Sequence, residues 1–464
     1  MEKTVRAFGL RDKVGYMFGD FGNDFTFLFA SSFLMVFYMK VMGISGAVVG
    51  TLFLVARVID AFTDITMGRI VDKVKPAKDG RFRPWLRRVA GPVAIASFLM
   101  YQTFLADASM TVRIIYMYVT YILWGSVCYT AINIPYGSMA SAISAVPEER
   151  TSLSTFRSIG ATLANLVIGV AAPMIIYTTD ANGAQVIRNG GQIFPLVAGI
   201  FSVCAILCYM ICYKCCLERV KVEPNPDAKP VSMVSAMKSI VTNRAMLGII
   251  GAALFLLMSQ LLIMGLNNYV YADYFGDVKA LATFNMINTV GSLAIASVVG
   301  KLSARFGKKE SATVGVAFST AMYFVLFMVR TDNPWVFMAI SAVGFLGLSL
   351  FNMVIWANIT DVIDDAEVRT GKREDGTIYA FYSFARKVGQ ALAGGLSGYA
   401  LSLIGYQEMA AVQSDSVLSS LYSVATLSPA IMFLCVAVML GVVYPLSKKK
   451  VEENTAILRA RRGE

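Results

Sequence analysis

The 464-residue sequence contains no histidine. This absence excludes hydrolases that hold zinc through a pair of histidines, nucleophiles activated by histidine and proton relays through imidazole. Charged residues are also scarce, at 15% of the chain, against about 25% in a typical soluble protein. Because histidine is absent, any proton chemistry in this protein must use carboxylates, lysine or tyrosine.

Cysteine is present but indicates no disulfide framework. The chain has seven cysteines, an odd number, and five of them (Cys204, Cys208, Cys212, Cys215 and Cys216) gather at the end of one apolar segment. Because no histidine is available to complete a ligand set, we expect them to pack between helices or to face lipid. A metal site is the alternative.

Apolar residues dominate what remains: 56% of the chain is hydrophobic, and the mean hydropathy is +0.62. No soluble fold of this length could bury so much apolar surface, and disordered, collagen-like and coiled-coil chains have other compositions. We therefore predict an all-α membrane protein with twelve transmembrane helices. The apolar runs are 16–39, 44–68, 89–107, 114–144, 152–177, 193–213, 245–272, 280–300, 311–329, 334–360, 376–405 and 418–447.

The net charge of +11 is unevenly distributed along these runs. Of the 41 lysines and arginines, 32 fall in segments on the side of the N-terminus, five fall on the opposite side and four lie within apolar runs. This asymmetry predicts that both termini are cytoplasmic, in the cytoplasmic (plasma) membrane. The basic charge therefore indicates membrane topology, and we expect no nucleic-acid partner.

The longest connector divides the predicted helices into two groups of six, and the halves resemble each other. In each half, the turn after the second predicted helix begins with a glycine, Gly68 or Gly300, and continues with basic residues. Two repeated six-helix bundles with a pseudo-two-fold relation are the expected organisation. The predicted segments are an N-terminal bundle (1–213), a cytoplasmic central loop (214–244), a C-terminal bundle (245–447) and a cytoplasmic tail (448–464).

Charged side chains inside a membrane helix are costly and mark functional sites. Asp60 and Asp64 stand four residues apart, on one face of the second predicted helix, and would repel each other. A small cation or a shared proton between them would remove that repulsion, and Thr63 adds a hydroxyl oxygen nearby. The alternative is that Arg57 neutralises Asp60 in a static ion pair.

Asp24, Arg157 and Lys387 lie in three other predicted helices. Charged side chains that meet in a membrane cavity suit a solute rich in hydroxyl groups, and aromatic faces cover the apolar side of a sugar ring. Trp356 and Tyr382 offer such faces; the alternative is that they pack between helices or face lipid. Pro135 is expected to break the run 114–144, either at a cavity or at an ordinary kink.

Four motifs together resemble the glycoside–pentoside–hexuronide:cation symporters of the major facilitator superfamily, over nearly the whole chain. They are Gly19-Asp-Phe-Gly-Asn-Asp24-Phe, Phe53-Leu-Val-Ala-Arg57-Val-Ile-Asp60-Ala-Phe-Thr-Asp64, Asn133-Ile-Pro-Tyr-Gly-Ser-Met, and the segment from Asp361-Val-Ile-Asp364 to Phe384-Ala-Arg-Lys387-Val-Gly-Gln. The resemblance implies the major facilitator fold and sugar–cation symport by alternating access. It implies no enzyme activity and no cofactor beyond the coupling cation, Na⁺ or H⁺.

The resemblance also implies roles for individual residues. Asp60 and Asp64 fall on the carboxylates of the cation site, and Thr130 falls on a hydroxyl that assists them. Asp24 and Arg157 fall on sugar-binding positions, and Lys387 on a cavity lysine. Asp361 and Asp364 fall on acids that help to close the cytoplasmic gate.

Some positions depart from the pattern of the melibiose carrier. Asn133 replaces an acid, Gly137 a sugar-stacking tryptophan and Asn23 a lysine. Loss of an acid from the cavity, with Arg157 and Lys387 retained, favours an anionic sugar such as a glucuronide, with a pentoside as the alternative. The expected partners are thus a small sugar or glycoside, the cation and the lipid bilayer, with the protein acting as a monomer.

Other functions are compatible with parts of the sequence. A Na⁺-coupled lysolipid carrier of the same superfamily would share the fold, but would not need charged and polar side chains in the cavity. A non-transporting membrane sensor usually has a cytoplasmic signalling domain, and the chain after Tyr444 is only 20 residues long.

Overall fold

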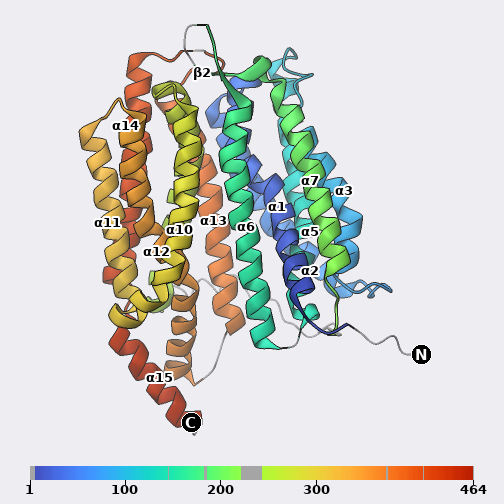
Figure 1. Cartoon of the computed structure of the whole chain (residues 1–464), viewed down its shortest axis with the longest axis vertical. Helices are drawn as coiled ribbons and strands as arrows, with labels where there is room; N and C mark the ends of the chain where they lie inside the picture. The colour runs from blue at the N-terminus through green and yellow to red at the C-terminus, as the bar shows by residue number, and fades with distance from the viewer. Residues whose placement is uncertain are drawn as a thin grey trace. The chain divides into compact units, whose positions relative to one another are not determined.

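Long helices run through nearly every apolar segment of the sequence (Figure 1). The chain forms two units: residues 1–228 with 401–413, and residues 229–400 with 414–464. Residues 221–242, most of the predicted central loop, lie outside the residues that the structure describes. This computed structural model describes residues 6–144, 146–181, 185–220, 243–371, 375–410 and 412–462.

Unit 1 contains six long helical segments among its described residues, and a short hairpin follows the fifth of them. The hairpin departs from the predicted all-α class, with Tyr177 pairing antiparallel to Ile187. The elements are α1 (Leu10–Val36) with η1 (Phe37–Val41), α2 (Gly46–Lys73), α3 (Arg83–Leu99), α4 (Met110–Ile122) with η2 (Leu123–Tyr129) and α5 (Thr130–Ile143), α6 (Pro147–Ile176), β1 (Tyr177–Thr179), β2 (Gln185–Ile187), η3 (Arg188–Gly191) and α7 (Ile193–Cys215).

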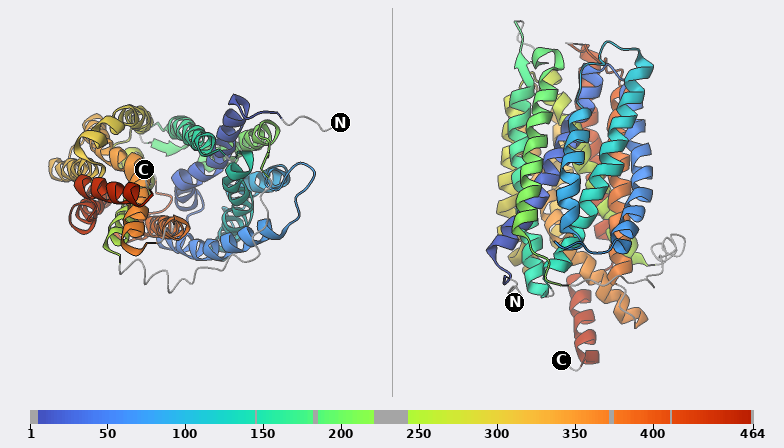
Figure 2. Two further views of the ribbon diagram at one scale, coloured as in Figure 1. Left: turned by 90° about the horizontal axis from the view of Figure 1, so that it is seen from below. Right: turned by 90° about the vertical axis from the view of Figure 1, so that its right-hand side faces the viewer.

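Unit 2 contains six further long segments among its described residues. Figure 2 shows them side by side, with a C-terminal helix that extends beyond their ends. They are α9 (Arg244–Tyr269) with η4 (Val270–Tyr274), α10 (Val278–Phe306), α11 (Lys308–Val329), α12 (Pro334–Thr370), α13 (Asp375–Leu403) and α14 (Asp415–Val438) with η5 (Met439–Val443); the C-terminal helix is α15 (Lys448–Arg462).

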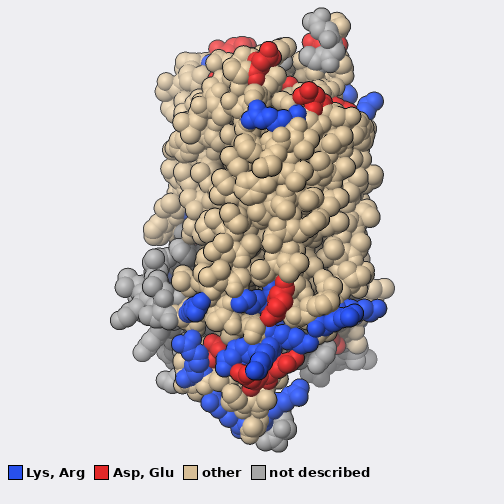
Figure 3. All heavy atoms as spheres, turned by 90° about the vertical axis from the view of Figure 1, so that its left-hand side faces the viewer, with Lys and Arg blue, Asp and Glu red and all other residues tan. Residues whose placement is uncertain are grey.

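The helices match the twelve predicted apolar runs. Within the described residues, ten helices are long and apolar enough to cross a membrane. A bilayer span needs at least about 17 residues, which is the length of α3. On one face of the molecule, Lys and Arg gather at the end that carries α15, next to a broad band almost free of charge (Figure 3). The predicted polytopic membrane fold is therefore confirmed.

Local sequence explains where several helices begin and end. Asn243, Asp277 and Asn333 each accept hydrogen bonds from the first amides of α9, α10 and α12, which have no partners inside the helix. Gly371 ends α12 in the left-handed conformation, at φ 70°, which glycine adopts without a steric cost. Gly307, at φ 101° and ψ 150°, separates α10 from α11 in another conformation that favours glycine.

Small residues allow α1 and α7 to approach closely in the core of unit 1. Gly15 and Gly19 of α1 face the cysteine-rich end of α7, and a Cβ added at Gly19 would lie 2.9 Å from the Cys212 sulfur. Cys208 and Cys212 are buried in this contact. The cysteine row therefore packs against glycines, as is common between membrane helices.

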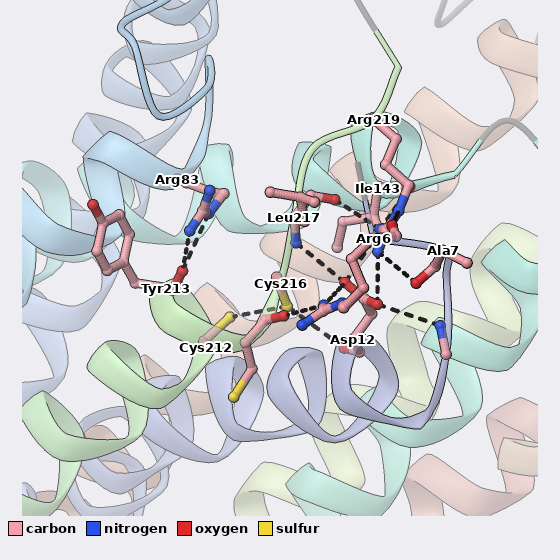
Figure 4. Close-up of polar contacts among 12 residues, drawn as sticks. Arg6, Ala7, Asp12, Arg83, Ile143, Cys212, Tyr213, Cys216, Leu217 and Arg219 are labelled. Atoms are coloured by element: carbon pink, nitrogen blue, oxygen red, sulfur yellow. Dashed lines mark hydrogen bonds and ion pairs between the residues drawn. The ribbon is translucent and has the colours of Figure 1, made fainter. Parts of the chain in front are cut away.

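A buried carboxylate joins the start of α1 to the chain that follows α7 (Figure 4). Asp12 has no exposed surface, and it forms ion pairs at 2.8 Å with both Arg6 and Arg219. The Leu217 amide donates to it at 3.2 Å. Arg219 also donates to the Ile143 carbonyl, at the end of α5, at 3.3 Å. The chain that leaves α7 is thus attached to two other helices of its own unit.

The neighbouring residue, Glu218, attaches the same segment to α3. Its carboxylate accepts hydrogen bonds of 2.7 to 2.9 Å from the backbone amides of residues 81 to 83. Amides at a helix start lack partners and carry partial positive charge, so a carboxylate stabilises them. In return, the Arg83 guanidinium donates at 2.6 Å to the Tyr213 carbonyl, at the end of α7.

Candidate cation and substrate sites

Two carboxylates of α2 face two hydroxyls of the η2–α5 segment in unit 1. The Ser126 hydroxyl donates to Asp60 at 2.5 Å, and the Thr130 hydroxyl donates to Asp64 at 3.0 Å. Each residue stands four positions from its counterpart on the same helix. The four side chains therefore form two parallel rungs between the helices, and Asp60, Ser126 and Thr130 are buried.

An arginine adjoins the first of these rungs. Arg57 lies 3.0 Å from the second carboxylate oxygen of Asp60, so the ion pair left open as an alternative is present. Arg57, Asp60 and Asp64 together carry a formal charge of minus one, which one monovalent cation would balance. The Thr63 hydroxyl donates to the Asp60 backbone carbonyl at 3.2 Å, and so turns toward its own helix.

The helix that carries both hydroxyls is irregular. Between α4 and α5 it widens into the π-helical turn η2, which contains Ser126. The helix is not interrupted at Pro135, because α5 continues through it to Ile143. A proline removes one hydrogen bond from a helix but does not always end it. The irregular turn therefore lies before Pro135, at the level of the Asp60 carboxylate.

Arg157 of α6 pairs with Asp20 of α1 in the same unit. The Nε atom lies 2.8 Å from the carboxylate, and Asp20 is only 7% exposed. The guanidinium carbon lies 5.3 Å from the centre of the Tyr136 ring. Tyr136 stacks on Tyr16 with ring centres 4.7 Å apart, and its hydroxyl donates to the Tyr16 carbonyl at 2.7 Å. The charge of Arg157 is therefore matched within unit 1.

Asn133 belongs to a chain of hydrogen-bonded polar side chains, and Asp24 is the sequence neighbour of another member. The Asn23 amide group donates to Asn133 at 3.3 Å and accepts from the Tyr209 hydroxyl at 2.8 Å. Asp24 follows Asn23 and stands one turn beyond Asp20, on the same side of α1. Within the described part of the chain, no hydrogen bond reaches the Asp24 carboxylate.

In unit 2, Trp356 of α12 and Tyr382 of α13 form an edge-to-face pair with ring centres 4.7 Å apart. Tyr382 is buried, whereas Trp356 is 42% exposed. Arg386, one turn after Tyr382, places its guanidinium carbon 5.9 Å from the centre of each ring. Lys387 belongs to α13, but its side chain lies outside the described residues.

The two predicted gate acids lie on α12 of unit 2. Asp361 is buried and pairs with Lys308, at the start of α11, at 2.5 Å. Asp364 is half-buried one turn further along α12. The adjacent Asp365 accepts a hydrogen bond from Asn454 of α15 at 3.0 Å. The C-terminal helix is thus attached to the same end of α12.

The Thr130 hydroxyl lies against Asp64, one turn from Asp60, so three of the residues that the resemblance assigns to the cation site are neighbours. Three further residues of these clusters were not assigned to a site from the sequence: Ser126, Asp20 and Arg386. A signal for Ser126 was present, because Ser126 and Thr130 repeat the four-residue spacing of the two carboxylates. Asp20 and Arg386 were recognisable only as charges within apolar runs.

A family model described as MFS/sugar transport protein matches residues 15–448 of the chain. An uncharacterized symporter of Bacillus subtilis, YjmB, is 32% identical over 449 residues, which cover 97% of this chain and 95% of that protein. A glucuronide carrier protein homolog of Escherichia coli is 31% identical over 445 residues, 96% of this chain and 94% of that one. A proposed sulfoquinovose importer of Salmonella typhimurium is 29% identical over 444 residues, 95% and 91% respectively.

Solved structures of transporters share the fold. The nucleoside transporter NupG aligns with a TM-score of 0.62 at 12% identity, over 92% of this chain and 98% of that one. A D-xylose-proton symporter aligns with a TM-score of 0.60 at 14% identity, over 95% of this chain and 98% of that one. Similarity at these identities concerns the fold alone.

Proposed function

Because the chain belongs to the MFS/sugar transport protein family, we propose that it is a secondary active symporter that couples uptake of an anionic glycoside to a cation gradient. The pair of rungs that joins Asp60 to Ser126 and Asp64 to Thr130 is the observation that carries this proposal. The site has the oxygen ligands and the charge that a coupling ion requires.

The coupling ion is one monovalent cation, Na⁺ or H⁺, at the two carboxylates. Arg57 balances one of the two negative charges, so one further positive charge makes the site neutral. Na⁺ would take oxygen ligands from Asp60, Asp64 and Thr130, as hard cations prefer. A proton would instead be shared by carboxylates that repel each other.

The substrate class follows from the polar residues of the predicted cavity and from the relatives. Asn133 carries no charge at a position where an acid would repel an anionic sugar, and Trp356 and Tyr382 offer faces for a sugar ring. One relative is named as a glucuronide carrier homolog and another as a proposed sulfoquinovose importer. Both names specify sugars with an acidic group, so a uronide is the first substrate to test.

Coupling between cation and sugar binding requires a connection between the cation site and the polar residues proposed to bind the sugar. Asp24 follows Asn23, whose amide donates to Asn133, and Asn133 stands three residues after Thr130 on α5. Ordering of Asp64 and Thr130 by the cation therefore orders the polar groups that bind sugar. Linkage then requires the cation and the sugar to raise each other's affinity by the same factor.

The proposed setting is the plasma membrane with both termini in the cytoplasm, because 32 of 41 basic residues lie on the N-terminal side. In that orientation, Asp361 and Asp364 lie at the cytoplasmic end and belong to the proposed cytoplasmic gate. Asp361 pairs there with Lys308 of the same unit. Alternating access of the site to the two sides of the membrane would then deliver the sugar inward.

Uptake into proteoliposomes tests this function. Labelled glucuronide and the matching neutral glucoside are each supplied with an inward Na⁺ gradient, an inward proton gradient, or neither. Gradient-dependent accumulation of the glucuronide is the expected result, and the effective gradient identifies the ion. Equal entry with and without both gradients, by protein of verified fold, would contradict symport.

A further inference from the structure

Arg386 is a charged residue in the middle of a membrane helix. It lies eleven residues after the start of α13 and seventeen before its end. Its guanidinium carbon lies 5.9 Å from the ring centres of both Trp356 and Tyr382. Aromatic rings attract a cation only modestly, and an arginine at membrane depth usually has a counter-charge or serves a function.

The other arginines inside apolar runs have such a counter-charge. Arg57 pairs with Asp60 and Arg157 pairs with Asp20, both in unit 1. For Arg386, no carboxylate among the described residues lies within ion-pair distance. Within the described part of the chain, Arg386 is therefore the intramembrane arginine whose charge is still available to a ligand.

The surroundings of Arg386 are accessible and partly polar. Asn352, Trp356 and Thr360 recur at every fourth position of α12, so they share one face, and all three are exposed. The Thr360 hydroxyl donates to the Trp356 carbonyl of its own helix at 3.2 Å, but an exposed asparagine is unfavourable against lipid hydrocarbon. This face of α12 is therefore suited to a water-filled cavity. The exposed ring of Trp356 is then within reach of a solute that also meets Arg386.

We propose that Arg386 binds the acidic group of the transported sugar, a carboxylate or a sulfonate, while the exposed ring of Trp356 covers the sugar ring. The inference rests on the proposed function and assigns its substrate specificity to one residue. A guanidinium suits this role because its planar fork donates two parallel hydrogen bonds to two oxygens of one acid. Tyr382 holds the fork in place from the buried side. Arg157, already paired with Asp20, instead orients groups of unit 1.

Equilibrium binding tests the inference on the purified full-length protein, with 4-nitrophenyl glucuronide and 4-nitrophenyl glucoside as probes. The variants are Arg386→Gln, which removes the charge, and Arg386→Lys, which keeps the charge but loses the fork. Arg88→Gln serves as a control, because Arg88 is exposed and lies in unit 1. A thermal unfolding curve for each variant verifies its fold.

The expected result is that Arg386→Gln weakens glucuronide binding by about tenfold or more, as for a lost hydrogen bond to a charge, and leaves glucoside binding nearly unchanged. Arg386→Lys should fall between Arg386→Gln and the native protein. An equal loss for both probes, no loss for either, or a native protein that binds both equally would overturn the inference. The two proposals can fail separately. If the protein binds glucuronide selectively through Arg386 but shows no gradient-driven uptake, the result contradicts the proposed symport and supports the role of Arg386.

Discussion

Asp20 of α1 and Arg157 of α6, 137 positions apart in the sequence, form an ion pair at 2.8 Å in the core of unit 1. Asp20 is buried, whereas Arg157 retains some exposure and lies over the Tyr136 ring. A buried carboxylate whose partner is removed loses its compensation, so the two residues depend on each other.

The first prediction concerns this pair. Arg157→Gln should lower stability by about 1–3 kcal/mol, because it leaves the Asp20 carboxylate buried without its cation. Adding Asp20→Asn to that variant should restore part of the loss. Thermal unfolding of the two single variants and the double variant measures the coupling. Losses that simply add would show that the pair is not coupled.

The second prediction concerns Asp12, which is buried between Arg6 and Arg219. Asp12→Asn leaves two arginines without their shared acid and should cost about 3–5 kcal/mol, as for other broken buried pairs. The unfolding midpoint should fall well below that of Arg88→Ala, which changes an exposed arginine. Equal midpoints for the two variants would show that the ion pairs of Asp12 with Arg6 and Arg219 do not stabilise unit 1.

The third prediction separates the two hydroxyls near Asp60. Ser126→Ala removes a hydrogen bond to the carboxylate and should weaken cation affinity by about tenfold or more. Thr63→Ala is the matched control, because the Thr63 hydroxyl donates to a backbone carbonyl of its own helix. Cation-dependent uptake rates, measured over a range of ion concentrations, give both affinities. A larger effect of Thr63→Ala than of Ser126→Ala would reverse the assignment.

The fourth prediction concerns Asp64. Asp64→Asn keeps the shape of the side chain and removes the charge that the second rung presents, so gradient-driven accumulation should be abolished. Counterflow of sugar between equilibrated compartments should persist in part, because it needs no net movement of the cation. Undiminished accumulation in Asp64→Asn proteoliposomes would exclude Asp64 from the coupling site.

Much of the fold could be predicted because a membrane constrains it so strongly. A backbone inside a bilayer must satisfy its own hydrogen bonds, so a long apolar run is a helix almost by necessity. The two acids at 60 and 64 were also readable, since their spacing alone places them on one face of a helix. Asp361 could be recognised only by resemblance, and its Lys308 partner lies on another helix.

Other features depend on contacts that no local pattern reveals. The π-helical turn at η2, rather than Pro135, is the irregular part of its span. The pairing of Asp20 with Arg157 depends on which faces of α1 and α6 meet. Likewise, Glu218 looks like an ordinary loop acid, although its carboxylate accepts three amides at the start of α3.

The most direct test of the coupling site is the affinity for glucuronide with and without the cation, in the native protein and in Asp64→Asn. Calorimetric titration at fixed pH, with Na⁺ present or replaced by a large organic cation, and again across pH, gives the dissociation constant of each protein with and without each ion. The effective cation should tighten sugar binding in the native protein and have no effect in Asp64→Asn. Sugar affinity in the native protein that does not change with Na⁺ or pH, or the same tightening in both proteins, would contradict a coupling site at Asp64.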